Sequence, residues 1–499
     1  SQNMLNETET GYENQINVLE RKNYIENKTL DKVFSNVGLD IKFKPNANQT
    51  IDFTLNTDFA EVEADDRIIN ISRFPILLPE KRLFFLENAD LFNSNQFDHR
   101  LFNSRRIGIK NGMPIPILAG LRFIGGNSKW QYGVLSMQTH EVENLEPATN
   151  HSVIRMKKNI GSLGSYIGLM NTNKISRDDY NSLTAIDANI RLTNTIRTRF
   201  VLGATFDKEL GNWKPLYGAS ITTFKTNGFG LQYRFREYTE DFNPGLGFVS
   251  QPNTKRLTLN HGWRKAYDNH KFLQSLSVGH YLRKNWLSNS GLPGIFQTNM
   301  YLSTRFIRGE SLGLFAPVYI EDNLYSPWEI SDGVTIPTSN YGMWEVNPFF
   351  GSGDARAYQY SLDLTYGNFY GGNRLTSSFS LSYDLNKSFK LELGGTYNQL
   401  RMPEAYTQNT SRKLNLSRYF SRLKFNFSTK ASLNSYFQYD TRADQFGVNL
   451  RFRYNPIEGT DLYIVYNHNA NTNRDLTMPR LPFTDNQLFI IKFSKTFIK

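Results

Sequence analysis

The chain has 499 residues, with 57 Lys and Arg against 46 Asp and Glu, which gives a formal net charge of +11. Only 39% of its residues are hydrophobic although 14% are aromatic, and no stretch approaches the roughly 18 to 20 consecutive apolar residues of a membrane helix. A helical membrane protein is excluded, and so is a disordered chain, because disordered chains are poor in aromatic residues. The absence of cysteine excludes disulfides, thiol catalysis and cysteine-based metal sites.

Residues 1–30 are rich in Asn, Glu and Lys and show no apolar period, so we expect a polar arm or linker there. The chain begins with Ser and shows no basic-then-apolar leader. We therefore expect a mature or trimmed chain.

From residue 31 to residue 499 the dominant feature is alternation of apolar and polar residues, which is typical of strands with two different faces. The clearest example is Leu375–Leu385, followed by the polar turn Asn386–Ser388 and a second alternating stretch at Phe389–Asn398. Two such stretches joined by a tight turn predict a hairpin.

Strands of this kind occur either in a soluble sandwich, whose core would be rich in Val, Ile and Leu, or in a transmembrane barrel, whose apolar face meets lipid. Here the polar faces carry many Arg, Lys, Asn and Gln residues, and the apolar faces are strongly aromatic. The sequence therefore predicts an all-β fold, namely a single large antiparallel transmembrane β-barrel in the bacterial outer membrane. Its length allows about 20 strands, with 16 to 22 plausible and an even number expected.

Basic residues fall on the polar faces of these predicted strands, where they would face the lumen. The lumen-facing set is Arg234, Arg236, Arg422, Lys424, Arg451 and Arg453. A basic lumen favours anionic solutes or balances acidic loops. Since these cations alternate along strands, nucleic acid is not an expected partner. The expected partners are outer-membrane lipid, a glycan or anionic solute, and other outer-membrane proteins or lipoproteins.

Residues 63–104 interrupt the alternation with a dense mixture of charged and apolar residues. We expect this segment to fold into the lumen as a plug or constriction, with a ligand-binding or gating element as the alternative. Because buried charges need partners, its ions should pair with one another or with wall residues such as Arg451 and Arg453. The residues predicted to form the plug or constriction are Arg73, Glu80, Lys81, Arg82, Glu87, Arg105 and Arg106.

Chemical motifs are scarce. The acidic run Asp58–Asp66 could offer carboxylates to Ca²⁺ but lacks the spacing of a known calcium loop, so no metal site is predicted. The seven histidines are scattered, with no H-E-x-x-H, and no phosphate-binding loop is present. We predict no catalytic residue and no cofactor.

Seven strings resemble the uncharacterised outer-membrane barrel domain that follows a family-9 carbohydrate-binding module in many Gram-negative bacteria. They are spread over roughly residues 33 to 499 and are DFAEVEAD (58–65), RFPILLPEKRLFFLENADLF (73–92), SRRIG (104–108), DFNPGLGFV (241–249), VTIPTSNY (334–341), GNFYGG (367–372) and TDLYIVYN (460–467). The resemblance implies an outer-membrane barrel with no assigned reaction and supplies no catalytic residues.

The favoured function is a pore or uptake component for glycans or other polar solutes. The alternative is a structural or partner-binding subunit of a larger assembly, with the long aromatic stretch Pro317–Gly351 as an exposed docking loop. A glycan-cleaving enzyme is suggested only by the companion module of the resembled family. A TonB-linked receptor ranks low, because such barrels carry a separate plug larger than the irregular segment here.

Overall fold

The computed structural model describes residues 37–57, 65–94, 97, 99–161, 163–223, 225, 227–353, 356–407, 411–476 and 479–495. The expected polar arm at residues 1–30 lies outside the described residues, as do positions 58–64 of the acidic run. No helix in the described part of the chain is long and apolar enough to cross a membrane.

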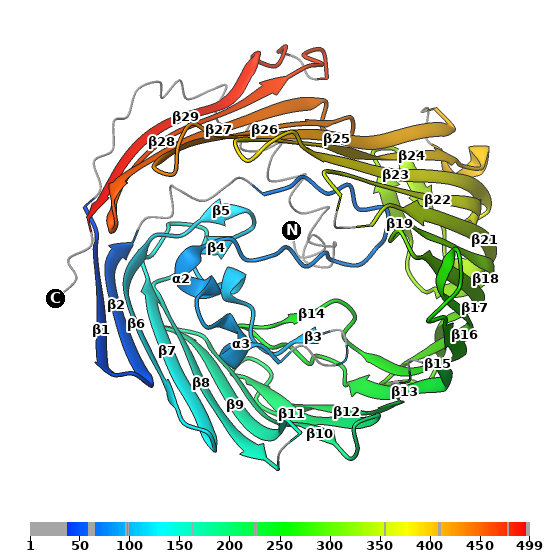
Figure 1. Cartoon of the computed structure of the whole chain (residues 1–499), viewed down its shortest axis with the longest axis horizontal. Helices are drawn as coiled ribbons and strands as arrows, with labels where there is room; N and C mark the ends of the chain where they lie inside the picture. Colours follow the sequence, from blue (N-terminus) through cyan, green and yellow to red (C-terminus); the bar gives the residue numbers. More distant parts are fainter. Residues whose placement is uncertain are drawn as a thin grey trace.

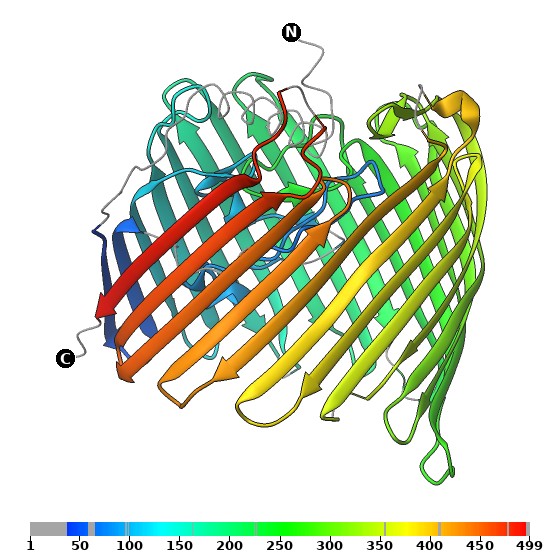
Figure 2. The ribbon, with the colours of Figure 1, turned by 90° about the horizontal axis from the view of Figure 1, so that it is seen from above.

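One antiparallel sheet of 23 strands dominates the fold and curls into a ring (Figure 1). Each strand pairs with the next member of the sheet along the sequence, and the strands are tilted relative to the ring axis (Figure 2). The strands are β1 (Leu39–Asn46), β2 (Gln49–Thr57), β6 (Ile117–Gly126), β7 (Trp130–Thr139), β8 (Thr149–Ile160), β9 (Ser165–Ser176), β10 (Tyr180–Arg191), β11 (Ile196–Asp207), β12 (Trp213–Thr223), β13 (Gly228–Tyr238), β15 (Thr254–Ala266), β16 (Leu273–Leu287), β17 (Pro293–Phe306), β18 (Ser311–Leu324), β21 (Ser339–Gly351), β22 (Tyr358–Phe369), β23 (Gly372–Asp384), β24 (Phe389–Arg401), β25 (Lys413–Asn426), β26 (Ala431–Asp440), β27 (Gln445–Ile457), β28 (Thr460–Asn471) and β29 (Thr484–Lys495).

Alternation along the strands places apolar and polar side chains on opposite faces of the ring. On β10 and β11, Ile186 and Leu202 are 52% and 57% exposed, whereas their neighbours Asp187 and Val201 are buried on the inner face. The predicted hairpin at residues 375–398 is present as β23 and β24, and apolar side chains of β23 such as Phe379 and Leu381 are likewise exposed. Soluble proteins bury such side chains and expose their charges. The polarity of this sheet is therefore inverted.

The strand count corrects the sequence prediction, because 23 strands exceed the expected range and are odd in number. The prediction allowed about 20 residues for each strand and its connection. Several connections contain only two residues, such as residues 47–48 between β1 and β2 and residues 370–371 between β22 and β23. Shorter turns leave enough chain for additional strands.

The two edge strands of the sheet are β1 and β29. They lie near each other on one side of the ring, but among the described residues no hydrogen-bonded ladder joins them (Figures 1 and 2). Because neighbouring strands alternate in direction, the first and last of 23 strands run the same way. A fully closed barrel therefore stays a prediction.

Between β2 and β6 the chain leaves the sheet and runs through the inside of the ring (Figure 1). The described residues of this stretch, 65–115, are called the inner segment. Its elements are short: α2 (Leu83–Leu86), α3 (Ala89–Phe92), β3 (His99–Arg100), the 3₁₀ turn η2 (Ser104–Arg106), β4 (Ile109–Lys110) and β5 (Met113–Pro114). The loop at residues 239–253 also turns inward, and its β14 (Phe248–Val249) pairs with β3. The alternation pattern did not predict this second inward loop.

A first hydrophobic cluster attaches the inner segment to strands β6–β13. Leu101 and Ile107 of the segment are fully buried and belong to the same cluster as Met137 of β7. Gly133, also on β7, allows α3 to approach closely, since a Cβ atom there would lie 2.7 Å from Cδ2 of Leu91. This side of the inner segment is therefore packed like a small protein core.

A second hydrophobic cluster lies on another part of the ring. Ile69 and Ile71 of the inner segment pack against it, and its buried members are Leu324, Trp328, Ile330, Val334, Ile336, Tyr341, Met343, Phe369, Tyr370, Leu400, Met402 and Leu416. The small hairpin of β19 (Trp328–Ser331) and β20 (Val334–Ile336) contributes to it, and the 3₁₀ turn η3 (Glu404–Tyr406) lies beside it. The segment thus contacts two separate apolar surfaces.

The second cluster corrects the interpretation of Pro317–Gly351 as an exposed aromatic loop. Pro317 lies within β18, Gly351 ends β21, and the connection between them folds into the buried β19–β20 hairpin. Trp328 is only 9% exposed. Trp328 and Tyr341 of this stretch serve packing, which composition alone did not distinguish from a docking surface.

The first cluster yields a test of how the inner segment is held. Leu101→Ala should lower the unfolding free energy of the segment by about 2–5 kcal/mol, because the side chain is fully buried. Limited proteolysis should then cut residues 65–115 faster while the sheet remains resistant. Leu202→Ala is the matched control, since Leu202 is exposed on the outer face, and equal effects of the two changes would contradict the packing described.

Candidate functional site

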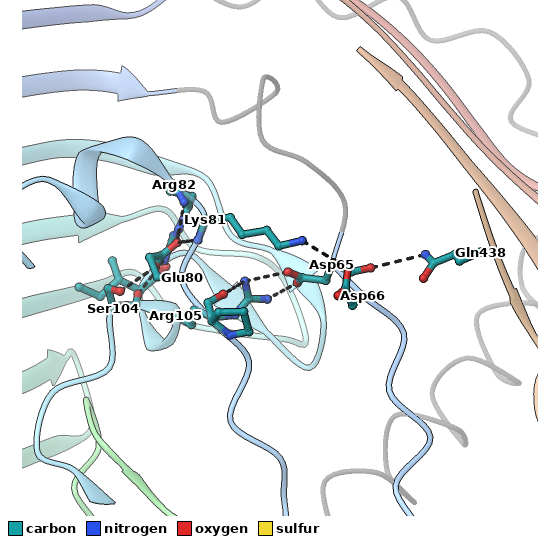
Figure 3. Close-up of polar contacts among 10 residues, drawn as sticks. Asp65, Asp66, Glu80, Lys81, Arg82, Ser104, Arg105 and Gln438 are labelled. Carbon is teal, nitrogen blue, oxygen red and sulfur yellow. Dashed lines mark hydrogen bonds and ion pairs between the residues drawn. The ribbon is translucent and has the colours of Figure 1, made fainter. Parts of the chain in front are cut away.

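The polar contacts of the inner segment begin with a buried ion pair within the segment. Arg82 donates from Nε to Oε1 of Glu80 at 2.8 Å and from Nη2 to Oε2 at 2.6 Å (Figure 3). The same guanidinium donates to the carbonyl oxygens of Ser104 and Ile107, each at 2.7 Å, and Ser104 Oγ donates to Glu80 at 2.7 Å. This pair therefore joins residues 80–82 to η2 and the residue after it.

The ionisation of Glu80 follows from this arrangement. Burial alone would raise its pKa, but the hydrogen bonds and charge of Arg82, together with the Ser104 hydroxyl, lower the pKa below the ordinary value of 4.5. The carboxylate is therefore charged at neutral pH, as the pair with Arg82 requires.

A second group of charges connects the inner segment to β25. Asp66 accepts a hydrogen bond from Nη2 of Arg422 at 2.5 Å. Lys81 Nζ lies 3.8 Å from the same carboxylate (Figure 3). Arg105 pairs with the neighbouring Asp65, with Nη1 at 3.2 Å from Oδ1. Burial would raise the pKa of Asp66, but Arg422 lowers it on balance. Asp66 thus carries the ionic contact between the inner segment and this part of the sheet.

The backbone beside Asp66 is held by polar side chains of β25, β26 and β28. The amide of Arg67 donates to Gln438 Oε1 at 3.0 Å, and Gln438 Nε2 donates to the carbonyl of Asp65 at 3.5 Å. Arg418 donates to the carbonyl of Arg67 at 2.5 Å, and Arg67 Nη2 donates to Asn469 Oδ1 at 3.0 Å. The segment is therefore fixed here by hydrogen bonds rather than by apolar packing.

Further along the segment, Arg73 reaches the wall at β18. Its Nη2 lies 2.8 Å from Oδ1 of Asp322, a buried carboxylate that also accepts a hydrogen bond of 2.5 Å from Tyr370. Asp322 therefore balances a charge of the inner segment at the edge of the second hydrophobic cluster.

Arg122 of β6 forms a contact of the same kind near α2. Its Nε donates to Asp52 of β2 at 2.8 Å, and its Nη2 lies 2.8 Å from Glu87 of the segment. Lys42 of β1 also pairs with Glu87. Burial would raise the pKa of Glu87, whereas the hydrogen bonds from Lys42 and Arg122 lower it on balance.

Three further basic side chains of the wall bind backbone carbonyls near α3. Arg155 of β8 pairs with Asp187 at 2.5 Å and donates from Nε to Leu91 O at 3.3 Å, while Lys157 donates to Asp90 O at 2.8 Å. Arg236 of β13, fully buried, donates to the carbonyl of Phe97 at 2.9 Å. These cations therefore satisfy acceptors that the irregular backbone leaves inside the ring.

The structure places the remaining predicted residues as follows. Arg106 donates from Nε to the carbonyl of Gly247 at 3.2 Å and so contacts the inward loop at residues 239–253. Alternation places Arg234, Lys424, Arg451 and Arg453 on the inner face with Arg236 and Arg422. Arg453 pairs at 2.7 Å with Asp461 of the neighbouring strand, which corrects the expectation that it pairs with the inner segment.

Sequence reasoning missed several charged wall residues that hold the segment or its partners, among them Arg122, Arg155, Asp187 and Asp322. Each is a charged residue at an inward position of an alternating strand, so the period-two pattern could have placed it on the inner face. The pattern could not show which inward charges meet the segment, because those contacts join residues far apart in the sequence.

The described residues contain no group of three or more His, Asp or Glu side chains placed to hold a metal ion. At the described end of the acidic run, Asp65 and Asp66 pair with basic side chains instead. The site is therefore a set of ionic and hydrogen-bonded attachments that position a segment inside the ring.

Comparison with protein families adds one assignment. The model of the domain of unknown function DUF5916 matches residues 18–115 and 134–458, so the chain belongs to this family, and the resemblance to an uncharacterised domain is confirmed. No curated protein matches the chain. Among solved structures, the siderophore receptor PirA from Acinetobacter baumannii is similar at 9% identity and a TM-score of 0.42, over 79% of this chain and 82% of that chain. That likeness is too weak to carry a conclusion about function.

The buried pair of Glu80 and Arg82 can be tested by a double-mutant comparison. Glu80→Gln should destabilise the inner segment by about 3–5 kcal/mol, because it leaves the Arg82 charge buried without its carboxylate. Adding Arg82→Met should restore part of the loss, since both charges are then gone. Guanidinium unfolding and proteolysis of residues 65–115 measure the effect. Glu404→Gln is the control because its pair with Arg412 is exposed, and a response as large as that of Glu80→Gln would refute the role of burial.

The lowered pKa values predict a pH dependence. The pKa of Glu80 falls below 4.5 and that of Asp66 below 3.8 in the folded protein. Each carboxylate therefore contributes stability that is complete above its ordinary pKa and is lost as pH falls through the lowered value. Proteolysis of the inner segment by an acid-active protease should rise below about pH 4 and stay constant from pH 5 to pH 7. A loosening centred near pH 6 would contradict the assignment to these carboxylates.

Proposed function

We propose that the protein is a bacterial outer-membrane β-barrel, that its interior is narrowed or closed by the inner segment, and that it admits polar solutes. In this proposal the sheet closes around the segment, and residues 65–115 act as the plug or constriction. Outer-membrane lipid is the partner of the outer face. A glycan or anionic solute as cargo, and other outer-membrane proteins or lipoproteins as partners, remain predictions.

The inverted polarity of the sheet is the observation that carries the proposal. Side chains such as Phe200, Leu202 and Phe235 are exposed on the outer face, whereas Arg155 and Arg236 are fully buried on the inner face. Burying apolar area is favourable by about 25 cal/mol for each Å², so an outer face of this kind is stable against lipid and unfavourable against water. Transmembrane barrels have an outward apolar band and a polar interior.

Support for a plug comes from where the segment is attached. It is fixed on one side by the apolar cluster with β6–β13 and on the other by Asp66 and Arg422 at β25. A segment held at separate places on the inner face lies across the path that a solute would take. The DUF5916 family provides no reaction.

The structural-subunit alternative rested on an exposed aromatic loop. Trp328 and Ile330 of that stretch are buried in the second cluster, so they are not part of a docking surface.

Planar-bilayer recording tests the proposal. The wild-type protein should insert from detergent into a lipid bilayer and show low conductance, whereas Arg82→Ala should raise the conductance because it removes the brace between residues 80–82 and η2. Arg480→Ala is the matched control, since its exposed pair with Asp475 lies in the connection after β28 and does not involve the segment. Failure to insert would refute the membrane assignment. A wild-type conductance that is high and unchanged by Arg82→Ala would refute the plug.

A further inference from the structure

Three aromatic side chains form a row on one part of the wall. They are Tyr301 of β17, Phe315 of β18 and Phe349 of β21, and they are called the aromatic strip. Strands β17, β18 and β21 are neighbours in the sheet (Figure 1). The ring centroids of Tyr301 and Phe315 are 6.1 Å apart, and those of Phe315 and Phe349 are 5.7 Å apart. The rings therefore follow one another across three strands.

Strand register shows that the strip faces the interior of the ring. Arg236, which contacts the inner segment, aligns with Arg256 of β15, and Arg256 aligns with Asn285 of β16. Gly279 lies an even number of residues from Asn285 on the same strand and so shares its face, and Gly279 aligns with Tyr301.

The other two rings lie on the same face as Tyr301. Register aligns Tyr301 with Phe315, and it aligns Phe349 with Gly313, two residues before Phe315. The next residue after Phe349 is Phe350, which is 38% exposed on the outer face. Phe315 is 37% exposed, and the other two members of the strip are partly exposed, so all three rings are accessible from inside the ring.

Glycine residues let the rings at both ends of the strip lie along the sheet. A Cβ atom on Gly279 of β16 would collide with Cζ of Tyr301, and one on Gly262 of β15 would lie 2.6 Å from the Tyr301 hydroxyl oxygen. A Cβ atom on Gly313 of β18 would collide with Cζ of Phe349. Each of these rings thus covers the backbone of a neighbouring strand, where only glycine leaves room for it. A ring that lies along the wall turns one of its faces toward the interior.

Polar side chains border the strip on the same face. Register aligns Asn347 of β21 with Phe315 and Asp363 of β22 with Phe349. Asp363 is exposed, so its carboxylate can accept hydrogen bonds from a solute. Among the described residues, the strip belongs to neither of the two hydrophobic clusters that hold the inner segment. This part of the wall therefore combines flat apolar surfaces with polar groups at their edge.

A sugar ring matches this combination. The faces of a pyranose carry C–H groups whose hydrogens are weakly positive, and the face of an aromatic ring is negative, so the two stack. The edge of a pyranose carries hydroxyl groups, which bind carboxylate and amide side chains. The spacing of the aromatic centroids is comparable with the length of one sugar unit. Successive units of a linear glycan can therefore lie over successive aromatic rings.

We propose that the aromatic strip binds a linear, uncharged oligosaccharide, whose sugar rings stack on Tyr301, Phe315 and Phe349 and whose hydroxyl groups bind Asn347 and Asp363. The inference rests on the proposed uptake function. It selects a glycan rather than an anionic solute as the cargo and assigns it a site on the inner wall.

Binding by the full chain tests the strip without requiring conduction. The protein is kept in a zwitterionic detergent that has no sugar head group, and binding is measured by isothermal titration calorimetry. The probes are maltohexaose and cellohexaose, which are uncharged linear oligosaccharides of different curvature, and sorbitol, which carries hydroxyl groups but no ring. We expect at least one of the two oligosaccharides to bind and sorbitol not to bind.

The double variant Phe315→Leu, Phe349→Leu should weaken oligosaccharide binding by about tenfold, because leucine keeps an apolar side chain but has no aromatic face. Phe349→Leu alone keeps the test valid if the double variant does not fold, and it should weaken binding to a smaller extent. Phe350→Leu is the matched control. It changes the same residue type at the next position, on the outer face, and should leave binding unchanged.

Four results would overturn the strip as a site: no binding of either oligosaccharide, equal binding of sorbitol, full binding by the double variant, or equal weakening by Phe350→Leu. Failure of the uptake function appears differently. A barrel that never conducts but binds an oligosaccharide through the strip leaves this site intact, whereas a conducting barrel that binds neither oligosaccharide overturns the site and leaves the pore.

Discussion

Charge inside a protein is stable only when it meets a partner, and the arrangement of this molecule depends on that constraint. The sheet exposes many large apolar side chains on its outer face, such as Leu202 and Phe200, and its buried charges such as Arg155 and Asp187 lie on the inner face. The inner segment supplies many of the partners they need. Arg122 pairs with Glu87, Arg422 pairs with Asp66, and Arg236 donates a hydrogen bond to the carbonyl of Phe97. The wall and the segment therefore stabilise each other, because each supplies partners for charged side chains of the other.

The attachments differ in kind from one side of the ring to the other. Against β6–β13 the segment is packed through residues such as Leu101 and Ile107. Against β25–β28 it is held by hydrogen bonds and by the pair of Asp66 with Arg422. Apolar packing responds little to salt or pH, whereas ion pairs respond to both. The β25–β28 side is thus the one that solution conditions can loosen first.

Much of the sheet could be predicted from the sequence, because a period of two is a local property. The hairpin at residues 375–398 and the irregular segment before β6 were both visible in the pattern. Seven charges of the segment could be named as candidates, since mixed charged and apolar residues fit neither strand face. Their partners could not be named. The contact of Arg73 with Asp322 joins residues 249 positions apart, and no local pattern encodes it.

Other misses have equally physical causes. The buried β19–β20 hairpin and the inward loop at residues 239–253 are short and aromatic or glycine-rich, a composition that exposed loops share. The strand count was underestimated because turns of two residues use less chain than the average connection. Composition and periodicity thus predicted the strands of the sheet. The segments that fold inside the ring depend on long-range packing, which these local patterns do not encode.

The odd number of strands has a topological consequence. The strands β1 and β29 run in parallel, so a seam between them would need a slanted bonding pattern unlike every other ladder in the molecule. The next strand, β2, runs opposite to β29 and could accept it in the usual antiparallel way, but β1 already occupies that edge. Antiparallel closure of the ring would thus require the edge of β2 that β1 covers, an edge whose backbone groups hydrocarbon would not tolerate unpaired.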